Sequence, residues 1–484
     1  MTLPTVYELS APGRRGLDLP DCDVPASPLP ADRRTDNGLP ELSQLDVVRH
    51  YLALAQRNFG VDSGFYPLGS CTMKYNPRLC EELARLAGFA DTHPLQDPAT
   101  VQGNLAVMHA LQESLAAIGG FEAVSLQPSA GAHGEFTALL MIRALHSDRG
   151  EGARDRVLIP DSAHGTNPAS TSMAGLVAVE IPSDARGNID LAALEAACDE
   201  RVAALMLTNP NTLGLFEEQV EEVARIVHGA GAVLYGDGAN MNALAGVVRP
   251  ADLGIDLMHF NLHKTFATPH GGGGPGAGPL AASSELAAYL PGPVVRRIDD
   301  GSASGGERYE FVMPARSIGR VAAFHGNFGM IVRALTYLEV LGGDGLLASS
   351  LHAVLGANYL RVRLKDMLPV PFDRACMHEF VCQGRVEGSP VRAIDIAKRL
   401  LDFGVHAPTN YFPLVVPEAL MIEPTETESR QTLDAFVDAI ARIIDESTRT
   451  PDTVLGAPHS TPVGRLDEVR AARHPVVQDQ FGRS

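Results

Sequence analysis

The sequence has 484 residues, of which 45% are hydrophobic and 20% are charged, a composition typical of a globular protein of two to four domains. Its formal net charge of −19, without a long basic run, argues against nucleic acid or an anionic membrane as the main partner. The six cysteines are scattered without a C-x-x-C pair, so we expect reduced thiols and no metal site. With no signal-peptide pattern and no apolar run of about eighteen residues, the sequence predicts a soluble cytoplasmic protein without a membrane span.

The first hundred residues carry little regular pattern. Residues 1–45 are rich in Pro, Asp and Arg, which predicts an extended arm. Residues 45–58 show helical spacing. Residues 65–77 combine Gly, Pro, aromatic rings and hydroxyls, so we expect a loop that forms either a ligand wall or an interface.

From about residue 100, helical and strand patterns alternate, which predicts an α/β fold with a mostly parallel sheet. The expected helices cover residues 101–118, 134–145, 190–200 and 217–228. The expected strands cover residues 157–159, 176–181, 203–208, 232–235 and 256–260.

Polar residues follow these strands at their carboxyl ends, where parallel sheets bind ligands. His164, Thr208, Asn209, Asp237 and Lys264 all occupy such positions. Their coincidence at one sheet edge is the strongest structural argument that the sequence offers.

Lys264 stands out because lysine is scarce. Only 4 of the 39 basic residues are lysines, and this one follows an apolar strand and precedes a glycine-rich run. Arginine cannot lose its proton to act as a nucleophile, so a lysine here indicates a role for its amine. Residues 271–276 also match G-x-G-x-x-G, but Pro275 lies inside the match and no helix opens from it, which disfavours dinucleotide binding.

An anion site is expected where a small-residue loop opens the helix near residue 134. Ser129, Ala130 and Gly131 leave backbone N–H groups at the positive end of the helix dipole. Many helices begin in this way, so this feature has weight only together with the others.

Each of these features suits one part of pyridoxal phosphate. Lys264 would form the Schiff base, Asp237 would pair with the ring nitrogen, and His164 would lie on the ring face. Ser129, Ala130 and Gly131 would hold the phosphate, and Thr208 or Asn209 the ring hydroxyl. Taken singly, Asp237 could belong to a plain turn and His164 to a polar loop.

A smaller α+β region follows a helix expected at residues 328–341. Its predicted strands cover residues 379–382 and 419–422, and its helices cover residues 391–403 and 429–444. Beyond residue 447 the composition predicts a surface tail. The expected domains are an arm and extension (1–95), a large cofactor-binding domain (96–335), a small domain (336–448) and the tail (449–484).

Several long motifs resemble the P-protein of the glycine cleavage system, glycine dehydrogenase (decarboxylating). They are residues 66–77, 160–169, 207–217, 261–266, 269–279, 411–414 and 420–428. The departures are slight: Ser129 and Asn410 stand where the family pattern leads us to expect Ala and Ile. The resemblance spans roughly residues 45 to 470, and the length resembles subunit 2 of the split bacterial form.

The resemblance implies a fold-type-I enzyme of the aspartate aminotransferase superfamily, with pyridoxal 5'-phosphate as a covalent aldimine on Lys264. It also implies decarboxylation of glycine and transfer of the aminomethyl group to the lipoyl group of H-protein. Ala239, beside Asp237, joins the expected cofactor-binding residues. Either His164 or His263 would handle protons. An α2β2 assembly with subunit 1, which lacks the cofactor lysine, is the expected oligomer.

Two other functions remain open at this point. One is a different fold-type-I activity, such as an amino-acid decarboxylase or an aminotransferase. An aminotransferase usually needs an arginine for a second carboxylate, and the sequence singles out none. The other is a cofactor-less scaffold that binds H-protein, which the presence of Lys264 and Asp237 disfavours.

Overall fold

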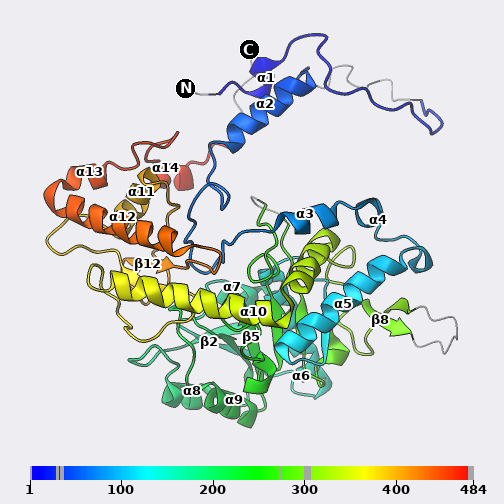
Figure 1. The fold of residues 1–484 in the computed structure, drawn as a ribbon. Coiled ribbons are helices and arrows are strands. Elements are labelled where there is room, and N and C mark those ends of the chain that lie inside the picture. The colour runs from blue at the N-terminus through cyan, green and yellow to red at the C-terminus, as the bar shows by residue number, and fades with distance from the viewer. Residues whose placement is uncertain (1–2, 29–31, 33–37, 272–274, 299–306, 478–484) are drawn as a thin grey trace. The chain divides into compact units, whose positions relative to one another are not determined.

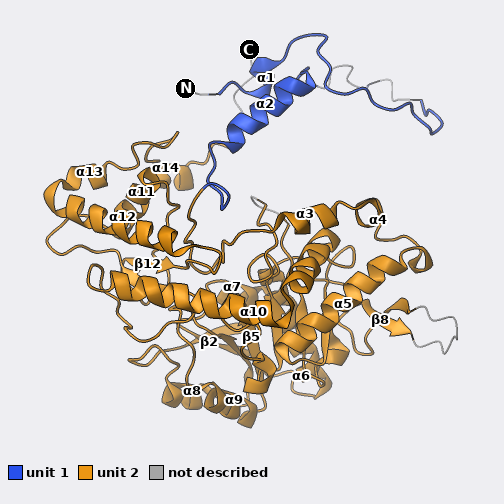
Figure 2. Ribbon diagram, in the orientation of Figure 1, with its two compact units in different colours: residues 1–63 blue, residues 64–484 orange. Residues whose placement is uncertain are grey.

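The structure is a computed structural model that describes residues 3–28, 32, 38–271, 275–298 and 307–477. The chain forms two compact units, Met1–Ser63 and Gly64–Ser484 (Figure 2). The middle of the glycine run, and with it part of the G-x-G-x-x-G match, lies outside the described residues.

The first unit holds two helices, each begun by a capping box. Helix α1 spans Val6–Leu9 after Thr5, and α2 spans Gln44–Ala55 after Ser43. The reciprocal side-chain and backbone bonds of such boxes satisfy N–H groups that a helix start leaves open. The helix expected at 45–58 is therefore confirmed, whereas α1 was not predicted.

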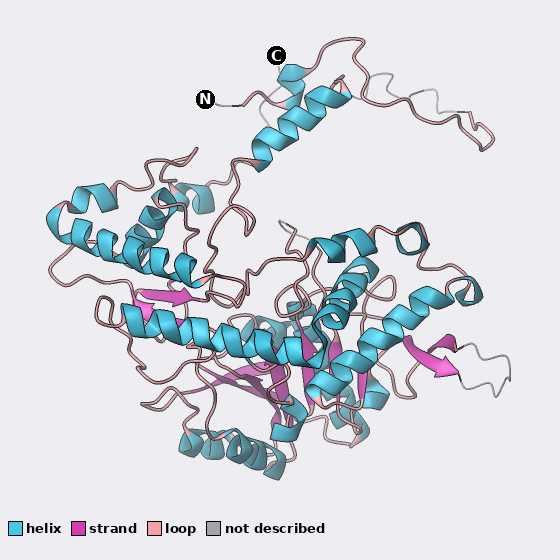
Figure 3. Cartoon of the chain, in the orientation of Figure 1, coloured by secondary structure: helices cyan, strands magenta, loops and turns pink. Residues whose placement is uncertain are grey.

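A seven-stranded sheet is the centre of the second unit (Figures 1 and 3), and it is mostly parallel, as predicted. In spatial order its strands are β1 (Ala123–Ser125), β7 (Leu280–Ala282), β6 (Leu257–Phe260), β5 (Val233–Gly238), β4 (Val202–Thr208), β2 (Arg156–Pro160) and β3 (Val177–Ile181). Strand β7 runs antiparallel to both β1 and β6, while β3, β2, β4, β5 and β6 pair in parallel. Strands β1 and β7 have three residues each and were not predicted.

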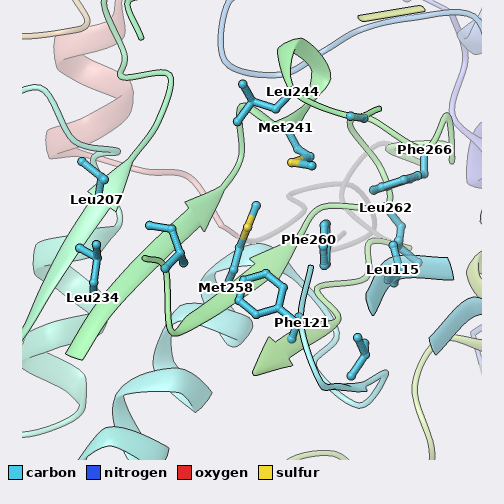
Figure 4. Close-up of a cluster of buried hydrophobic side chains, with 14 of the residues drawn as sticks. Leu115, Phe121, Leu207, Leu234, Met241, Leu244, Met258, Phe260, Leu262 and Phe266 are labelled. Atoms are coloured by element: carbon cyan, nitrogen blue, oxygen red, sulfur yellow. The ribbon is translucent and has the colours of Figure 1, made fainter. Parts of the chain in front are cut away.

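Both faces of the sheet are covered. Leu205 and Leu207 of β4 face one hydrophobic cluster, and Met206 between them faces another, because successive side chains of a strand point to opposite faces. Figure 4 shows part of the first cluster, around Phe260 and Phe266. The helices of this part are α3 (Arg78–Ala84), α4 (Ala87–Ala90), α5 (Gln102–Gly119), α6 (Gly131–Asp148), α7 (Asn167–Met173), α8 (Leu191–Ala197) and α9 (Val220–Gly229).

Helix α10 (Phe328–Leu364) joins the large sheet region to a smaller α+β region. Its first half adds residues such as Ile331 to the core over the sheet, and its second half adds Leu360 to a separate core. Non-helical Gly342 (φ 62°, ψ −174°) interrupts it, one residue beyond the end of the helix that the sequence predicts.

The small region is a three-stranded antiparallel sheet with helices. Its strands, in spatial order, are β10 (Phe380–Gln383), β12 (Ala419–Ile422) and β11 (Thr409–Asn410). Its helices are α11 (Ala393–Asp402), α12 (Arg430–Arg449), α13 (Pro451–Leu455) and α14 (Glu468–Arg473). A two-stranded ribbon of β8 (Val294–Ile298) and β9 (Arg308–Val312) precedes α10.

The prediction of a surface tail beyond residue 447 is wrong at its start. Val454 of α13 and Ala457 are fully buried, and Val454 belongs to the core of the small region. The Pro and Thr content of this segment suggested a tail. Pro451 instead starts the short helix α13, since proline suits the first helical position.

By length and composition alone, α10 could cross a membrane, since one 18-residue window has a mean hydropathy of 1.3. The sequence did not indicate this helix as a span because Gly, Ser, Thr and charged residues interrupt its apolar run. One such helix is weak evidence for a membrane span; 22% of that window is buried, and α10 supplies buried residues to two cores.

Candidate active site at the carboxyl edge of the sheet

Three polar side chains lie in one row across neighbouring strands. In the parallel register, Asp237 of β5 pairs with Thr208 of β4 on one side and with His259 of β6 on the other. Register partners direct their side chains to the same face, and all three residues are buried. The backbone N–H of His164 donates to the Thr208 hydroxyl at 3.0 Å. The structure thus brings His164, Thr208 and Asp237 together at one sheet edge.

Asp237 is held as a buried carboxylate. Asn167 Nδ2 and the backbone N–H of Ala239 donate to its two oxygens, each at 2.9 Å, and His259 Nε2 lies 3.5 Å away. Burial alone would raise the pKa of Asp237, but His259, His164 and the Asn167 bond outweigh burial and lower it. A buried anion of this kind suits a protonated ring nitrogen. Ala239 therefore acts on Asp237 through its backbone.

Glu135 of α6 completes this cluster and was missed from the sequence. Its carboxylate accepts hydrogen bonds from Thr166 Oγ1 and from Ser170 Oγ. Burial, and then the charge of Asp237, raise the pKa of Glu135 to about 7. The two acids therefore separate into a carboxylate, Asp237, and a proton carrier, Glu135. The available signal was an acid among the apolar residues of the helix expected at 134–145.

The expected anion loop begins helix α6. No side chain in the described part of the chain caps this 18-residue helix, whose N-cap is Ala130. A Cβ on Gly131 would lie 2.4 Å from Asn261 Oδ1, so a larger residue would displace that side chain. The Ser129 N–H is already bonded to His133 Nδ1 at 3.1 Å. The open N–H groups of the first helical turn are thus better placed for a phosphate than that of Ser129.

Lys264 follows β6 on a turn closed by its own N–H, which donates to the Asn261 carbonyl at 3.1 Å. Its side chain is buried. Burial, and then the charge of Lys264, lower the pKa of neighbouring His263 to about 3, and burial also lowers that of His164. Burial therefore disfavours the charged form of both rings.

Asn209 serves the turn after β4. Its Oδ1 accepts the backbone N–H of Glu217 at 3.0 Å, whereas the Thr208 hydroxyl faces His164. Of the two alternatives for a ring hydroxyl, Thr208 is the better placed.

The loop at 65–77 is tied down by Lys74, whose role the sequence did not reveal. Its ammonium donates to Glu426 Oε1 at 2.7 Å, to Tyr337 Oη at 3.0 Å and to Asn242 Oδ1 at 3.1 Å. Lys74 is buried, so this ion pair is shielded from water. It links the loop to α10 and to the segment after β12.

These residues fit pyridoxal phosphate. Within the described ranges, Gly131 begins a helix without a side-chain cap, Asp237 is a buried carboxylate, and Lys264, buried after the neighbouring strand β6, supplies an amine. The Thr265 and Thr268 hydroxyls are buried without a partner in the described residues, which provides polar atoms for a ligand.

Comparisons with known proteins identify the family of the chain. The pattern of the family "Glycine dehydrogenase, C-terminal domain" matches residues 349–459, and that of "Aminotransferase class-V" matches residues 137–274. The chain is 53% identical to the probable glycine dehydrogenase (decarboxylating) subunit 2 of Staphylococcus haemolyticus, over 98% of this chain and 97% of that protein. It is 55% identical to the protein of the same description from Exiguobacterium sibiricum, with the same coverage.

Solved structures show the fold. A crystal structure of glycine decarboxylase (P-protein) in inhibitor-bound form matches with a TM-score of 0.70 at 22% identity, covering 88% of this chain and 92% of that one. Glutamate decarboxylase of Lactobacillus brevis matches with a TM-score of 0.64 at 12% identity, covering 92% and 98%. The fold is that of the fold-type-I enzymes that use pyridoxal phosphate. Because the chain is 53% and 55% identical to the relatives from Staphylococcus haemolyticus and Exiguobacterium sibiricum over 98% of its length, it belongs to the glycine dehydrogenase (decarboxylating) subunit 2 family.

Proposed function

We propose that this chain decarboxylates glycine with pyridoxal phosphate bound covalently to Lys264 and passes the aminomethyl group to the lipoyl group of an H-protein. The observation that carries the proposal is that Asp237 on β5 and Lys264 just after the neighbouring strand β6 are both buried, in a chain 53% identical to a probable glycine dehydrogenase subunit 2.

Each residue has a distinct task in this proposal. Lys264 anchors the cofactor, Asp237 keeps a proton on the ring nitrogen, and the first turn of α6 from Gly131 binds the phosphate. Thr208 bonds the ring hydroxyl. When bound, pyridoxal phosphate supplies an electron sink for the pair of electrons left by carbon dioxide.

The two candidate histidines divide the remaining work. His164 is fixed by its ring bond to Thr166 Oγ1 at 2.8 Å, which suits a flat wall against the ring. His263 has a buried Nδ1 without a partner in the described residues, and with its pKa lowered to about 3 the neutral ring can accept a hydrogen bond there from the substrate's amino group.

The assembly is proposed on family grounds. We infer a cytoplasmic α2β2 complex with subunit 1, since the similar proteins are named subunit 2. Residues 96–335 would form its cofactor-binding domain and 336–448 its small domain. Light scattering of the chain with and without subunit 1 measures the stoichiometry, and a fully active homodimer would contradict it.

The activity is tested by release of labelled carbon dioxide from carboxyl-labelled glycine, with subunit 1 and lipoylated H-protein present. We expect release that depends on both proteins and thiol formation on the lipoyl group. Unlipoylated H-protein is the control. Release of carbon dioxide from larger amino acids but not from glycine would contradict the proposal.

The variant Asp237→Asn tests the ring-nitrogen partner. Asparagine keeps the shape but loses the charge, and a hydrogen bond to a charged group contributes about 1.5–3 kcal/mol. We expect cofactor affinity to fall by about 10- to 150-fold, with a larger fall in turnover. Titration of the purified chain with cofactor, followed by absorbance, measures the first effect. Unchanged affinity and turnover would remove Asp237 from the cofactor site.

A further inference from the structure

A second buried acidic cluster lies in the small region, apart from Asp237 and Glu135. Glu379 directly precedes β10 and Glu423 directly follows β12, next to the register pair Phe380 and Ile422. Their side chains and that of His378 are fully buried. One polar atom from each of the three lies within 4.8 Å of the others.

Backbone groups of the loop at 65–77 bind these acids. The Ser70 N–H donates to Glu379 Oε2 at 2.6 Å, and the Thr72 N–H donates to Glu423 Oε2 at 2.9 Å. Both loop residues have positive φ, 63° and 49°, which is unusual outside glycine. The acids thus hold the loop in a costly backbone conformation.

The cluster nevertheless keeps unused polar atoms. Glu423 Oε1 and both ring nitrogens of His378 have no hydrogen-bond partner in the described part of the chain, although His378 Nε2 lies 3.8 Å from Glu423 Oε1. Loop anchoring therefore accounts for only part of the cluster, because a purely structural site leaves few buried atoms unsatisfied.

The charges around the cluster do not neutralise two carboxylates. Lys264 lies close enough to affect the two carboxyls of the cluster, but Glu426 and the Cys71 thiol also lie close enough to affect groups of the cluster. Burial, and then Lys264, lower the pKa of His378 to about 3, so the imidazole is neutral.

The acids therefore share protons. Burial raises the pKa of Glu423 to about 7, and burial, followed by the charge of Glu423, raises the pKa of Glu379 well above its ordinary range. Two adjacent buried carboxylates are not both ionised near neutral pH.

The reaction proposed above consumes one proton. Glycine as a zwitterion loses carbon dioxide, its carbon forms a bond to one sulfur of the disulfide, and the S–S bond breaks. The other sulfur leaves with the electron pair and becomes a thiol only when it takes up a proton. Each turnover thus converts glycine, disulfide and one proton into carbon dioxide, an aminomethyl thioether and a thiol.

We propose that Glu379 and Glu423 form a proton-holding carboxyl pair that supplies this proton to the sulfur released from the disulfide. The sulfur as proton acceptor rests on the proposed function. The protonated state of the carboxyl pair is a property of the chain itself. Lys264 lies close enough to act on the pKa of both Glu379 and Glu423, both carboxyls are fully buried, and backbone N–H groups of the loop at 65–77 bind them.

The first test does not depend on activity. Infrared spectra of the cofactor-loaded protein in H2O and D2O at neutral pH are compared for the wild type, Glu379→Gln, Glu423→Gln and the exposed control Glu113→Gln. We expect an isotope-sensitive carbonyl band of a protonated carboxyl that is lost in one or both cluster variants and kept in the control. Identical spectra in all four proteins would overturn the proposal, and so would a bound metal found by elemental analysis in the wild type and lost in both cluster variants.

The second test follows the proton in single turnovers with lipoylated H-protein. Glutamine keeps an oxygen for the Ser70 and Thr72 N–H groups but cannot deliver a proton. We expect thiol formation to slow by about 10²- to 10⁴-fold, while the cofactor spectrum and glycine affinity stay within about threefold. In the wild type this step should slow as pH rises above neutrality.

Unchanged thiol formation would overturn the proposal. Loss of cofactor and glycine binding in both variants would do so too, since it would show a structural role alone. If the wild type itself forms no thiol, the proposed function fails, and the infrared bands still decide whether the carboxyl pair holds a proton.

Discussion

Lys264→Ala should abolish turnover and covalent cofactor binding while the chain stays folded. Within the part of the chain that the structure describes, Lys264 is the one lysine that closely follows a strand of the large sheet, and no arginine can replace its amine. Loss of the covalent nucleophile in other enzymes costs many orders of magnitude, so we expect turnover to fall on the order of 10⁴-fold or more. Glycine-dependent carbon dioxide release measures the effect, and circular dichroism reports the fold.

The matched control is Lys365→Ala. Lys365 is exposed and pairs with Asp373 at 3.1 Å, away from the sheet edge, so its variant should keep full turnover. Substantial turnover by Lys264→Ala, or an equal loss in both variants, would contradict the role of Lys264.

Lys74→Met should be the most destabilising of the single substitutions proposed. Methionine fills the space but leaves Glu426 buried without its counter-ion, and breaking a buried pair in this way costs about 3–5 kcal/mol. Urea unfolding measures the free energy, and Lys74→Met combined with Glu426→Gln should recover most of the loss. The exposed pair of Lys365 gives the control: Lys365→Met should cost about 0–1 kcal/mol.

The ion pair of Lys74 and Glu426 also predicts that the free energy of unfolding falls in acid. Burial would raise the pKa of Glu426, but Lys74 outweighs burial and lowers it. The stability from this carboxylate is therefore present above the ordinary glutamate range and is lost as pH falls through the lowered value. The double variant should lose less stability in acid than the wild type, and an unaltered acid profile would contradict the account.

The sequence predicted most accurately the features that one continuous segment determines. Asp237 and Lys264 were visible because each polar residue follows an apolar strand, and a parallel sheet places such ends at one edge. Strands β1 and β7 were missed because three residues are too few to show a period.

The missed site residues depend on contacts between distant segments. Glu379 and Glu423 meet only because β10 and β12 pair antiparallel, and Lys74 meets Glu426 across 352 positions of sequence. No local pattern distinguishes such residues from solvated charges. The proton held by Glu135 likewise depends on Asp237, which β5 brings beside α6.

The central claim is that Lys264 carries pyridoxal phosphate, and one spectrum tests it most directly. Absorption of the purified wild-type chain is recorded with subunit 1 present, before and after borohydride, and the labelled peptide is mapped. The account predicts a visible band that borohydride removes and a single label on Lys264. No bound cofactor under these conditions, or a label on another lysine, would contradict it.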